Sequence, residues 1–236
     1  MRVMSFNTNL GRTSDGKPSL LRQAGAITQH QPDVVMLQEV DSRTIRRGFL
    51  NQAKELSTNT NLPFYAFGKT IKGRLGIGAF GNAILSRYPL REVENHIVPK
   101  PVGVSTEHRD ERGVLQAVID LNGISHYLFC VHYSFRSQLY RIENSQFLLN
   151  RLPPEWPKIV GGDLNALQAS QEVAMLSPVL SNARREFNPE APESIDHIFF
   201  NHAGKRRYLV ERFETIETDA SDHKPILADL KFEDAL

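Results

Sequence analysis

The stretch Ile159-Val160-Gly161-Gly162-Asp163-Leu164-Asn165-Ala166 places polar chemistry directly after a buried strand. The apolar pair Ile159 and Val160 is typical of a strand end, and the two glycines let another group approach the backbone closely. If the extended backbone continues, Asp163 and Asn165 point to the same side. A carboxylate beside an amide suits a divalent cation, an attacking water or a phosphate oxygen. The same residues also suit a helix cap followed by a turn, so both interpretations stay open at this point.

The same arrangement recurs along the chain: an apolar strand borders on a group that can coordinate an ion or transfer a proton. Each case alone is explained by a turn residue or by a core histidine with satisfied hydrogen bonds. Together they are hard to ascribe to chance, because clustering such groups costs free energy unless a bound cation or anion compensates. The residues concerned are Asn7, Glu39, His132, Asp163 with Asn165, Asp196 with His197, and Asp222 with His223.

This set contains what metal-assisted hydrolysis of a phosphoester requires. Magnesium prefers oxygen ligands, a carboxylate or base must orient the attacking water, and imidazolium and amide donors must meet charge on the phosphate oxygens. The motifs of three other classes are absent from the chain. It has no HExxH or cysteine cluster for zinc, no GxSxG of a serine hydrolase and no Walker-type GxxxxGK[ST]. The residues therefore favour a magnesium-dependent phosphoesterase.

Bulk composition is that of an ordinary globular protein. The chain has 236 residues, 40% of them hydrophobic and 23% charged, with a formal net charge of +1. Any basic surface must therefore be local. Cys130 is the only cysteine; it excludes an intrachain disulfide, favours a reducing compartment, and is expected in the core. We find no signal peptide and no apolar run long enough to span a bilayer. We expect a cytoplasmic, monomeric protein without membrane insertion.

The order of expected elements indicates an α/β protein. A strand, a helix and a second strand open the chain, and Asn122-Gly123 marks a tight hairpin. We find no internal repeat or linker, so residues 1–236 are expected to form a single domain with two sheets and flanking helices. Helices are expected over 18–31, 48–56, 138–152 and 168–176, and strands over 1–6, 34–37, 64–67, 82–89, 92–98, 114–121, 126–132, 195–200, 208–215 and 225–232, with a glycine-rich loop over 72–81 and a surface loop over 98–113.

Nearly end to end, the sequence resembles the endonuclease/exonuclease/phosphatase superfamily, which has the fold of pancreatic deoxyribonuclease. This resemblance implies a four-layer α/β/β/α sandwich (class α/β, α+β) of two mixed β-sheets flanked by helices, with the site at one edge. The matching segments are Ser5-Phe6-Asn7, Leu37-Gln38-Glu39-Val40, Gly81-Asn82-Ala83-Ile84-Leu85-Ser86-Arg87, Arg112-Gly113-Val114, Val131-His132, Gly162-Asp163-Leu164-Asn165, Ser194-Ile195-Asp196-His197-Ile198-Phe199 and Ser221-Asp222-His223-Lys224-Pro225.

The resemblance also implies a metal site. Glu39 is then the principal ligand of Mg²⁺, with Mn²⁺ as the alternative ion. Asn7 lies beside the metal or the phosphate, and Asp222 adds to the metal site. Asn9 stands where some members of the superfamily carry an aspartate, which weakens the case for a second metal.

The remaining roles follow from the same resemblance. Asp163 orients or deprotonates the attacking water, and Asn165 assists it. His223 contacts the phosphate with Asp196 behind it as the orienting carboxylate, and His132 is a second phosphate-stabilising group.

Substrate binding is expected at Arg112, Asn82 and Arg43. Further basic residues near the expected site loops either hold phosphate or form a solvated surface: Arg46, Arg47, Lys72, Arg74 and Arg109. The substrate is a phosphoester, with nucleic acid first and a lipid or small headgroup as the alternative. The near-neutral net charge argues mildly against tight nonspecific duplex binding. A non-catalytic binding module is a third hypothesis, which predicts losses among the metal and phosphate groups.

Overall fold

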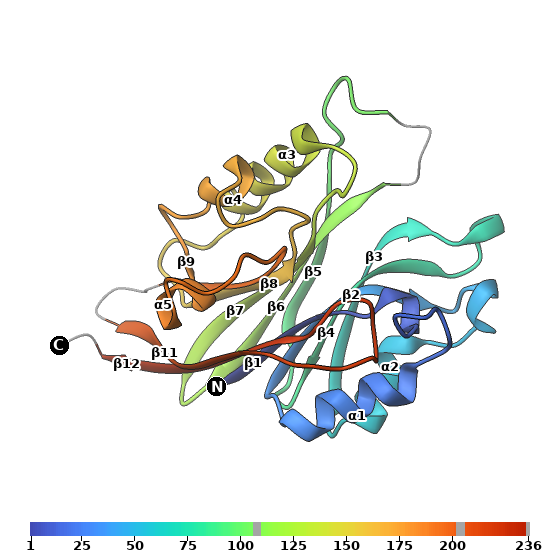
Figure 1. The fold of residues 1–236 in the computed structure, drawn as a ribbon, viewed down its shortest axis with the longest axis horizontal. Coiled ribbons are helices and arrows are strands. Elements are labelled where there is room, and N and C mark those ends of the chain that lie inside the picture. Colours follow the sequence, from blue (N-terminus) through green and yellow to red (C-terminus); the bar gives the residue numbers. More distant parts are fainter. Residues whose placement is uncertain (106–109, 202–205, 235–236) are drawn as a thin grey trace.

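The computed structural model describes residues 1–105, 110–201 and 206–234. Two six-stranded sheets pack face to face within these residues. Helices cover the outer face of each sheet, so that the layers run helix, sheet, sheet, helix (Figure 1). The four-layer α/β/β/α sandwich expected from the sequence is confirmed.

The first sheet contains both ends of the described chain. Its two central neighbours β1 and β2 are parallel, and its other strand pairs are antiparallel. The strands follow the order β11 (Arg206–Thr215), β12 (Ile226–Asp234), β1 (Arg2–Asn7), β2 (Val34–Ser42), β4 (Ala79–Ser86) and β3 (Phe64–Lys72).

The second sheet comes from the middle of the chain. Here β7 and β8 are the parallel pair, and the other neighbours are antiparallel. The strands follow the order β5 (Arg91–Val98), β6 (Arg112–Leu121), β7 (Ile124–His132), β8 (Lys158–Asp163), β10 (Asp196–Phe200) and β9 (Ser181–Asn182).

The helices lie over the sheets on opposite sides of the sandwich (Figure 1). α1 (Leu20–His30) and α2 (Gln52–Asn59) cover the first sheet, whereas α3 (Gln138–Leu149) and α4 (Gln171–Ala174) cover the second. A short helix, α5 (Ala183–Phe187), contacts β10 and β11. Three single turns of 3-10 helix complete the described elements: η1 (Asn9–Gly11), η2 (Ile45–Arg47) and η3 (Arg74–Gly76).

The surroundings of strand β2 explain why residues 34–37 are all apolar. Val34 and Met36 pack between the two sheets, whereas Val35 and Leu37 pack on the opposite face beneath α1 and α2. Both faces of the strand are buried, which is the situation that favours an unbroken apolar run over an alternating one. Cys130 joins the core between the sheets, and burial raises the pKa of its thiol to about 12. Its expected place in the core is confirmed.

Several element boundaries differ from the expected ones. The helix expected over 48–56 begins only after Asn51, whose side chain accepts a hydrogen bond from the Lys54 amide at 3.2 Å and so caps α2. β4 begins at Ala79, inside the stretch expected to be a loop. Neither β9 nor α5 was expected, because two- and five-residue elements carry no measurable periodicity.

The structure defines the conformation of two glycine-containing segments. Asn122 and Gly123 both have positive φ, 52° and 77°, as a two-residue hairpin turn requires, so the expected hairpin is confirmed. Gly76, Gly78 and Gly81 have the spacing of a dinucleotide-binding fingerprint, but they lead into strand β4 and not into a helix. That spacing therefore carries no nucleotide-binding meaning here.

The described helices are also too short or too polar to cross a lipid bilayer, since none combines the length and the apolarity that a membrane-spanning segment needs.

A buried polar contact between His126 and Tyr208 joins the two sheets. His126 of β7 is 2% exposed, and its Nδ1 lies 2.5 Å from the hydroxyl of Tyr208 on β11. The ring also packs edge-on against Phe232 of β12. Burial, with a smaller contribution from the charged N-terminus, lowers the pKa of His126 to about 4.

This contact predicts a loss of stability in mild acid. The unfolded chain takes up a proton on His126 near pH 6.5, whereas the folded protein does so only near pH 4, so folding free energy is lost as the pH falls between these values. Between pH 7 and pH 5 this group should reduce the free energy of unfolding by about 2 kcal/mol. Urea unfolding of the wild type and of His126→Gln at both pH values tests this. The variant should lose less stability on acidification, and equal losses would contradict the assignment.

Candidate active site

The site lies where strand ends from both sheets meet. The parallel strands β1 and β2 place Asn7 beside Gln38, one residue before Glu39. In the second sheet, β7 and β8 place His132 beside Asp163, and β10 begins opposite with Asp196. The carboxyl ends of parallel strands lie at one edge of a sheet, where ligands commonly bind. Face-to-face packing brings the edges of the two sheets together at this place.

One carboxylate oxygen, Oδ2 of Asp163, is the meeting point of three side chains. Asn7 donates a hydrogen bond to it from Nδ2 at 3.0 Å. The Nε2 atoms of His132 and His223 lie 3.6 and 3.8 Å from the same oxygen. Asp163 itself is only 1% exposed. Three parts of the chain far apart in sequence therefore converge on a single buried acceptor.

Asn165 contributes through the backbone. Its φ is 48°, so the chain turns after Asp163 and does not stay extended. Its amide N–H donates to Oδ1 of Asp163 at 2.8 Å, and its Nδ2 donates to the Tyr133 carbonyl at 3.1 Å. The side chains of Asp163 and Asn165 therefore do not project side by side, as they would on an extended strand. Asn165 instead fixes the orientation of the carboxylate.

Asp196 and His223 form a second pair. Oδ2 of Asp196 lies 3.0 Å from Nδ1 of His223, which leaves Nε2 directed toward Asp163. Oδ1 of Asp196 is buried and has no hydrogen-bond partner within the described residues. Such an oxygen is costly to bury unless a cation or a water satisfies it.

The two histidines of the site are driven to opposite protonation states. For His223, burial lowers the pKa, but the hydrogen bond and charge of Asp196, with the charges of Asp163 and Asp222, raise it overall to about 9. For His132, burial and the nearby charges of Arg112 and His223 lower the pKa well below its ordinary value. At neutral pH the site therefore holds one imidazolium and one neutral imidazole.

Asp163 is correspondingly basic. Burial raises its pKa, and the negative charge of Asp196 raises it further, while His223, Asn165 and Asn7 oppose the change. A carboxylate with a raised pKa is a better proton acceptor near neutral pH than an exposed one.

Glu39 enters the site on an irregularity in β2. The register between β2 and β4 shifts between Leu37 and Val40, and Glu39 has a φ of 57°, an uncommon conformation for a residue with a side chain. Burial raises the pKa of its carboxyl, as does the charge of Asp222, whereas a hydrogen bond from Asn7 lowers it. Backbone strain of this kind often accompanies a functional site.

The donor set fits a hard divalent cation. Glu39 offers a carboxylate that burial destabilises, and Asp196 offers a buried oxygen without a partner among the described residues. Ligand atoms of Asp163, Asp196 and His223 also lie within 4.8 Å of one another. Nδ1 of His223 is already bonded to Asp196, so the oxygen atoms are the better candidates, and oxygen donors are what magnesium prefers.

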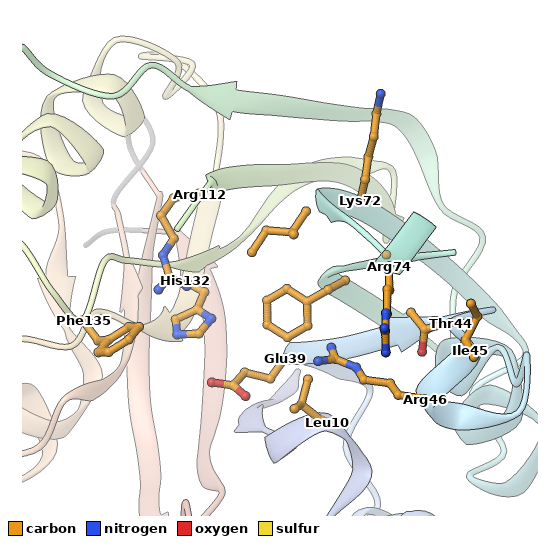
Figure 2. Close-up of a pocket in the computed structure, with 13 residues that line it drawn as sticks. Leu10, Glu39, Thr44, Ile45, Arg46, Lys72, Arg74, Arg112, His132 and Phe135 are labelled. Carbon is orange, nitrogen blue, oxygen red and sulfur yellow. The ribbon is translucent and has the colours of Figure 1, made fainter. Parts of the chain in front are cut away.

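A cavity of about 550 Å³ adjoins this cluster. Glu39, His132 and Arg112 form its boundary with the strand ends, and their side chains point toward it in Figure 2. The described residues that line it are Leu10, Glu39, Thr44, Ile45, Arg46, Ile71, Lys72, Gly73, Arg74, Phe80, Arg112, His132 and Phe135.

A family model for the endonuclease/exonuclease/phosphatase family matches residues 4–223 of this chain. The chain belongs to this family. It is also 27% identical over 173 residues to the uncharacterized protein YbhP of Escherichia coli K12, an alignment that covers 70% of this chain and spans only 66% of the relative's length.

Two solved structures resemble this chain over nearly its whole length. A mannosyl-6-phosphatase from Bacteroides thetaiotaomicron matches with a TM-score of 0.71 and 20% identity, over 98% of this chain and all of that one. A sphingomyelinase C from Streptomyces griseocarneus matches with a TM-score of 0.65 and 19% identity, over 97% and 98% of the two chains. At these identities the likeness establishes the fold and leaves the substrate open.

Within this family fold, most of the residues expected at the site lie together. Asn7 donates a hydrogen bond to Asp163 and lowers the pKa of the Glu39 carboxyl, and Arg112 bounds the cavity while its guanidinium pairs with Asp110 at 2.6 Å. Asp222 is exposed and acts on Glu39 and His223 through its charge.

Two expected substrate-binding residues lie elsewhere. The Asn82 side chain is buried and donates to the carbonyls of Gly113 and Cys130, so it ties the two sheets together. Arg43 is exposed and does not line the cavity. Of the other basic residues, Arg46, Lys72 and Arg74 line the cavity, whereas Arg109 lies outside the described residues.

The apolar wall of the cavity was not foreseen from the sequence. Leu10, Ile45, Ile71, Phe80 and Phe135 come from five separate segments, and only the fold brings them together. One signal was available for Phe135, which follows the strand end at His132 by three residues.

The Asp196–His223 pair predicts a measurable titration. In the metal-free protein, Asp196→Asn should lower the pKa of His223, because it removes the hydrogen bond to a charged acceptor and leaves the burial unchanged. Asp222→Asn removes a smaller contribution and should lower that pKa less. NMR titration of the imidazole with chelator present measures both. An equal effect of the two variants would contradict the pairing.

Proposed function

We propose that this protein is a phosphoester hydrolase that depends on a divalent cation, Mg²⁺ first and Mn²⁺ as the alternative, and that residues 1–236 act as one domain. The observation that carries the proposal is the convergence of Asn7, His132 and His223 on one oxygen of Asp163. Membership of the endonuclease/exonuclease/phosphatase family supports the same reaction class.

Glu39 is the residue proposed to hold the cation, with Asn7 beside it and Asp222 at its outer edge. When bound, the cation would neutralise charge on the phosphate oxygens and favour attack at phosphorus. A carboxylate whose pKa is raised by burial gains most from such a partner, because the charged form is the one that desolvation penalises.

Asp163 is proposed as the group that orients the attacking water and accepts its proton. The Asn165 amide holds one carboxylate oxygen and Asn7 holds the other, so the acceptor is fixed before substrate arrives. As the water oxygen bonds to phosphorus, the ester P–O bond breaks and its electron pair leaves with the alcohol oxygen.

The histidines are proposed to stabilise the phosphate. His223 is cationic at neutral pH, so its Nε2–H can donate to a phosphate oxygen that gains charge in the transition state. Asp196 keeps the ring oriented for this contact. His132 is neutral and Arg112 is fixed by Asp110, so both serve as preorganised partners of the phosphate.

For the substrate we propose a phosphodiester of the nucleic-acid type first. A lipid or small headgroup is the second candidate, favoured by the apolar wall of the cavity. A formal net charge of +1 supports a substrate bound through few phosphates, since nonspecific duplex binding relies on many.

Two substitutions test the reaction class. Glu39→Gln and His223→Ala should each reduce magnesium-dependent hydrolysis on the order of 10³-fold. Glu39→Gln should leave the unfolding temperature nearly unchanged, since it removes a carboxylate that burial and the charge of Asp222 destabilise. His223→Ala should lower it, since it takes a cationic partner away from Asp163 and Asp196. Initial rates on a generic phosphodiester and thermal unfolding in chelator measure the two effects.

Glu190→Gln is the matched control, because Glu190 is exposed and lies outside the cavity and the catalytic cluster. It should retain full activity. Wild-type activity that persists in chelator, or retention of activity by either site variant, would refute the proposal.

One panel distinguishes the substrates. Plasmid DNA, single-stranded RNA, sphingomyelin and phosphoinositides are each incubated with magnesium, manganese or chelator, and product is quantified. Turnover of a nucleic acid with either metal supports the first candidate. Turnover confined to lipid or headgroup substrates replaces it with the second. A protein that binds metal but turns over none would be the non-catalytic module of the third hypothesis.

A further inference from the structure

We propose that the cavity beside the catalytic cluster binds the organic part of the substrate, and that it selects a flat apolar group carrying a second anion. The proposal rests on the proposed function, because it takes the phosphate to lie against Glu39, His132 and Arg112. It goes beyond that function by naming the class of organic group that the cavity selects.

The cavity is apolar where an organic group would lie. Leu10, Ile45 and Ile71 provide aliphatic surface, and Phe80 and Phe135 provide two aromatic rings. A sugar or polyol would leave its hydroxyl groups without partners on such a wall, which costs free energy. A flat ring would instead bury apolar area and could stack on the phenyl rings.

Two arginines lie across the cavity from the phosphate end. In Figure 2, Arg46 and Arg74 approach one another on the side opposite His132 and Arg112. Glu39 is the only acidic residue among the described lining residues. A substrate that meets both ends therefore needs an anion at each end and an apolar group between them.

Arg46 is held in place by the protein. Its Nε and Nη2 donate to the two carboxylate oxygens of Asp41, each at 2.7 Å, and its guanidinium lies 5.7 Å from the centre of the Phe80 ring. These two bonds leave Nη1 for a ligand. The guanidinium face adds a further flat surface against which a ring can stack.

The Arg74 carbonyl accepts a hydrogen bond from the Ile77 amide at 3.1 Å, but its side chain has no ion pair or hydrogen bond within the part of the chain that the structure describes. It sits in the turn between β3 and β4, which the Gly73 amide closes with a 2.9 Å hydrogen bond to the Gly78 carbonyl. A Cβ on Gly78 would lie 2.3 Å from the Arg43 carbonyl oxygen, so this turn is packed against the segment that carries Arg46. The two arginines therefore share one compact rim.

Binding of non-hydrolysable probes tests the inference without relying on catalysis. The probes are 2-naphthylmethylphosphonate, its 6-carboxy derivative and the phosphonate analogue of glucose 6-phosphate, titrated calorimetrically into the full-length protein with magnesium. The carboxylated naphthyl probe should bind about two- to fivefold more tightly than the plain one, as expected for a partly exposed ion pair. The sugar probe should bind at least about tenfold more weakly than the plain naphthyl probe.

Two variants test separately how the cavity recognises the second anion and the apolar group. Arg74→Gln should reduce the gain from the carboxylate, since of the two arginines only Nη1 of Arg46 then remains to bind it, and should leave the plain naphthyl probe unchanged. Ile45→Asn places a polar group on the apolar wall at a residue that is 41% exposed, so folding is not at risk, and it should weaken both naphthyl probes several-fold. Arg212→Gln on β11, away from the cavity, is the control and should change nothing.

The outcomes separate this inference from the proposed function. Equal or tighter binding of the sugar probe, or equal weakening of all three probes by Arg74→Gln, would overturn the pocket assignment even if the protein hydrolyses phosphoesters. The expected order of binding without any metal-dependent hydrolysis would uphold the pocket and remove the proposed function.

Discussion

A buried carboxylate at the end of β8 is the constraint on which the rest of the site depends. Asp163 is almost fully excluded from solvent, and its burial is tolerable only because Asn7, the Asn165 amide and two histidines surround it. These partners come from both sheets. The sandwich must therefore close for the carboxylate to be satisfied, and the closed sandwich carries the candidate active site at its edge.

The electrostatics of the site follow from that arrangement. Asp196 holds His223 in the charged form, while burial beside Arg112 and His223 keeps His132 neutral. Neighbouring groups of the same chemical type thus take different protonation states, which is the condition for dividing acid, base and binding roles. Glu39 adds a carboxylate on a strained backbone, and strain at such a position is stable only where surrounding packing enforces it.

The candidate active site and the cavity beside it are built from different kinds of segment. Most of the candidate active site is built on the ends of paired strands within the two sheets. Part of the cavity wall comes from connecting segments: η2, between β2 and α2, carries Ile45 and Arg46, and η3, between β3 and β4, carries Arg74. Turns can change sequence without disturbing the core, so substrate selectivity can vary while the reacting groups stay in place.

The sequence by itself determined the fold class and most of the candidate active site, because buried strands and the polar groups at their ends leave a local pattern. Asn7, Glu39, Asp163 and His223 were recognisable for that reason. Only the tertiary structure decided which neighbours share a hydrogen bond, that Asn82 ties the sheets together, and that five separate apolar side chains form one wall. Those contacts join residues tens to hundreds of positions apart, and local spacing carries no information about such distances.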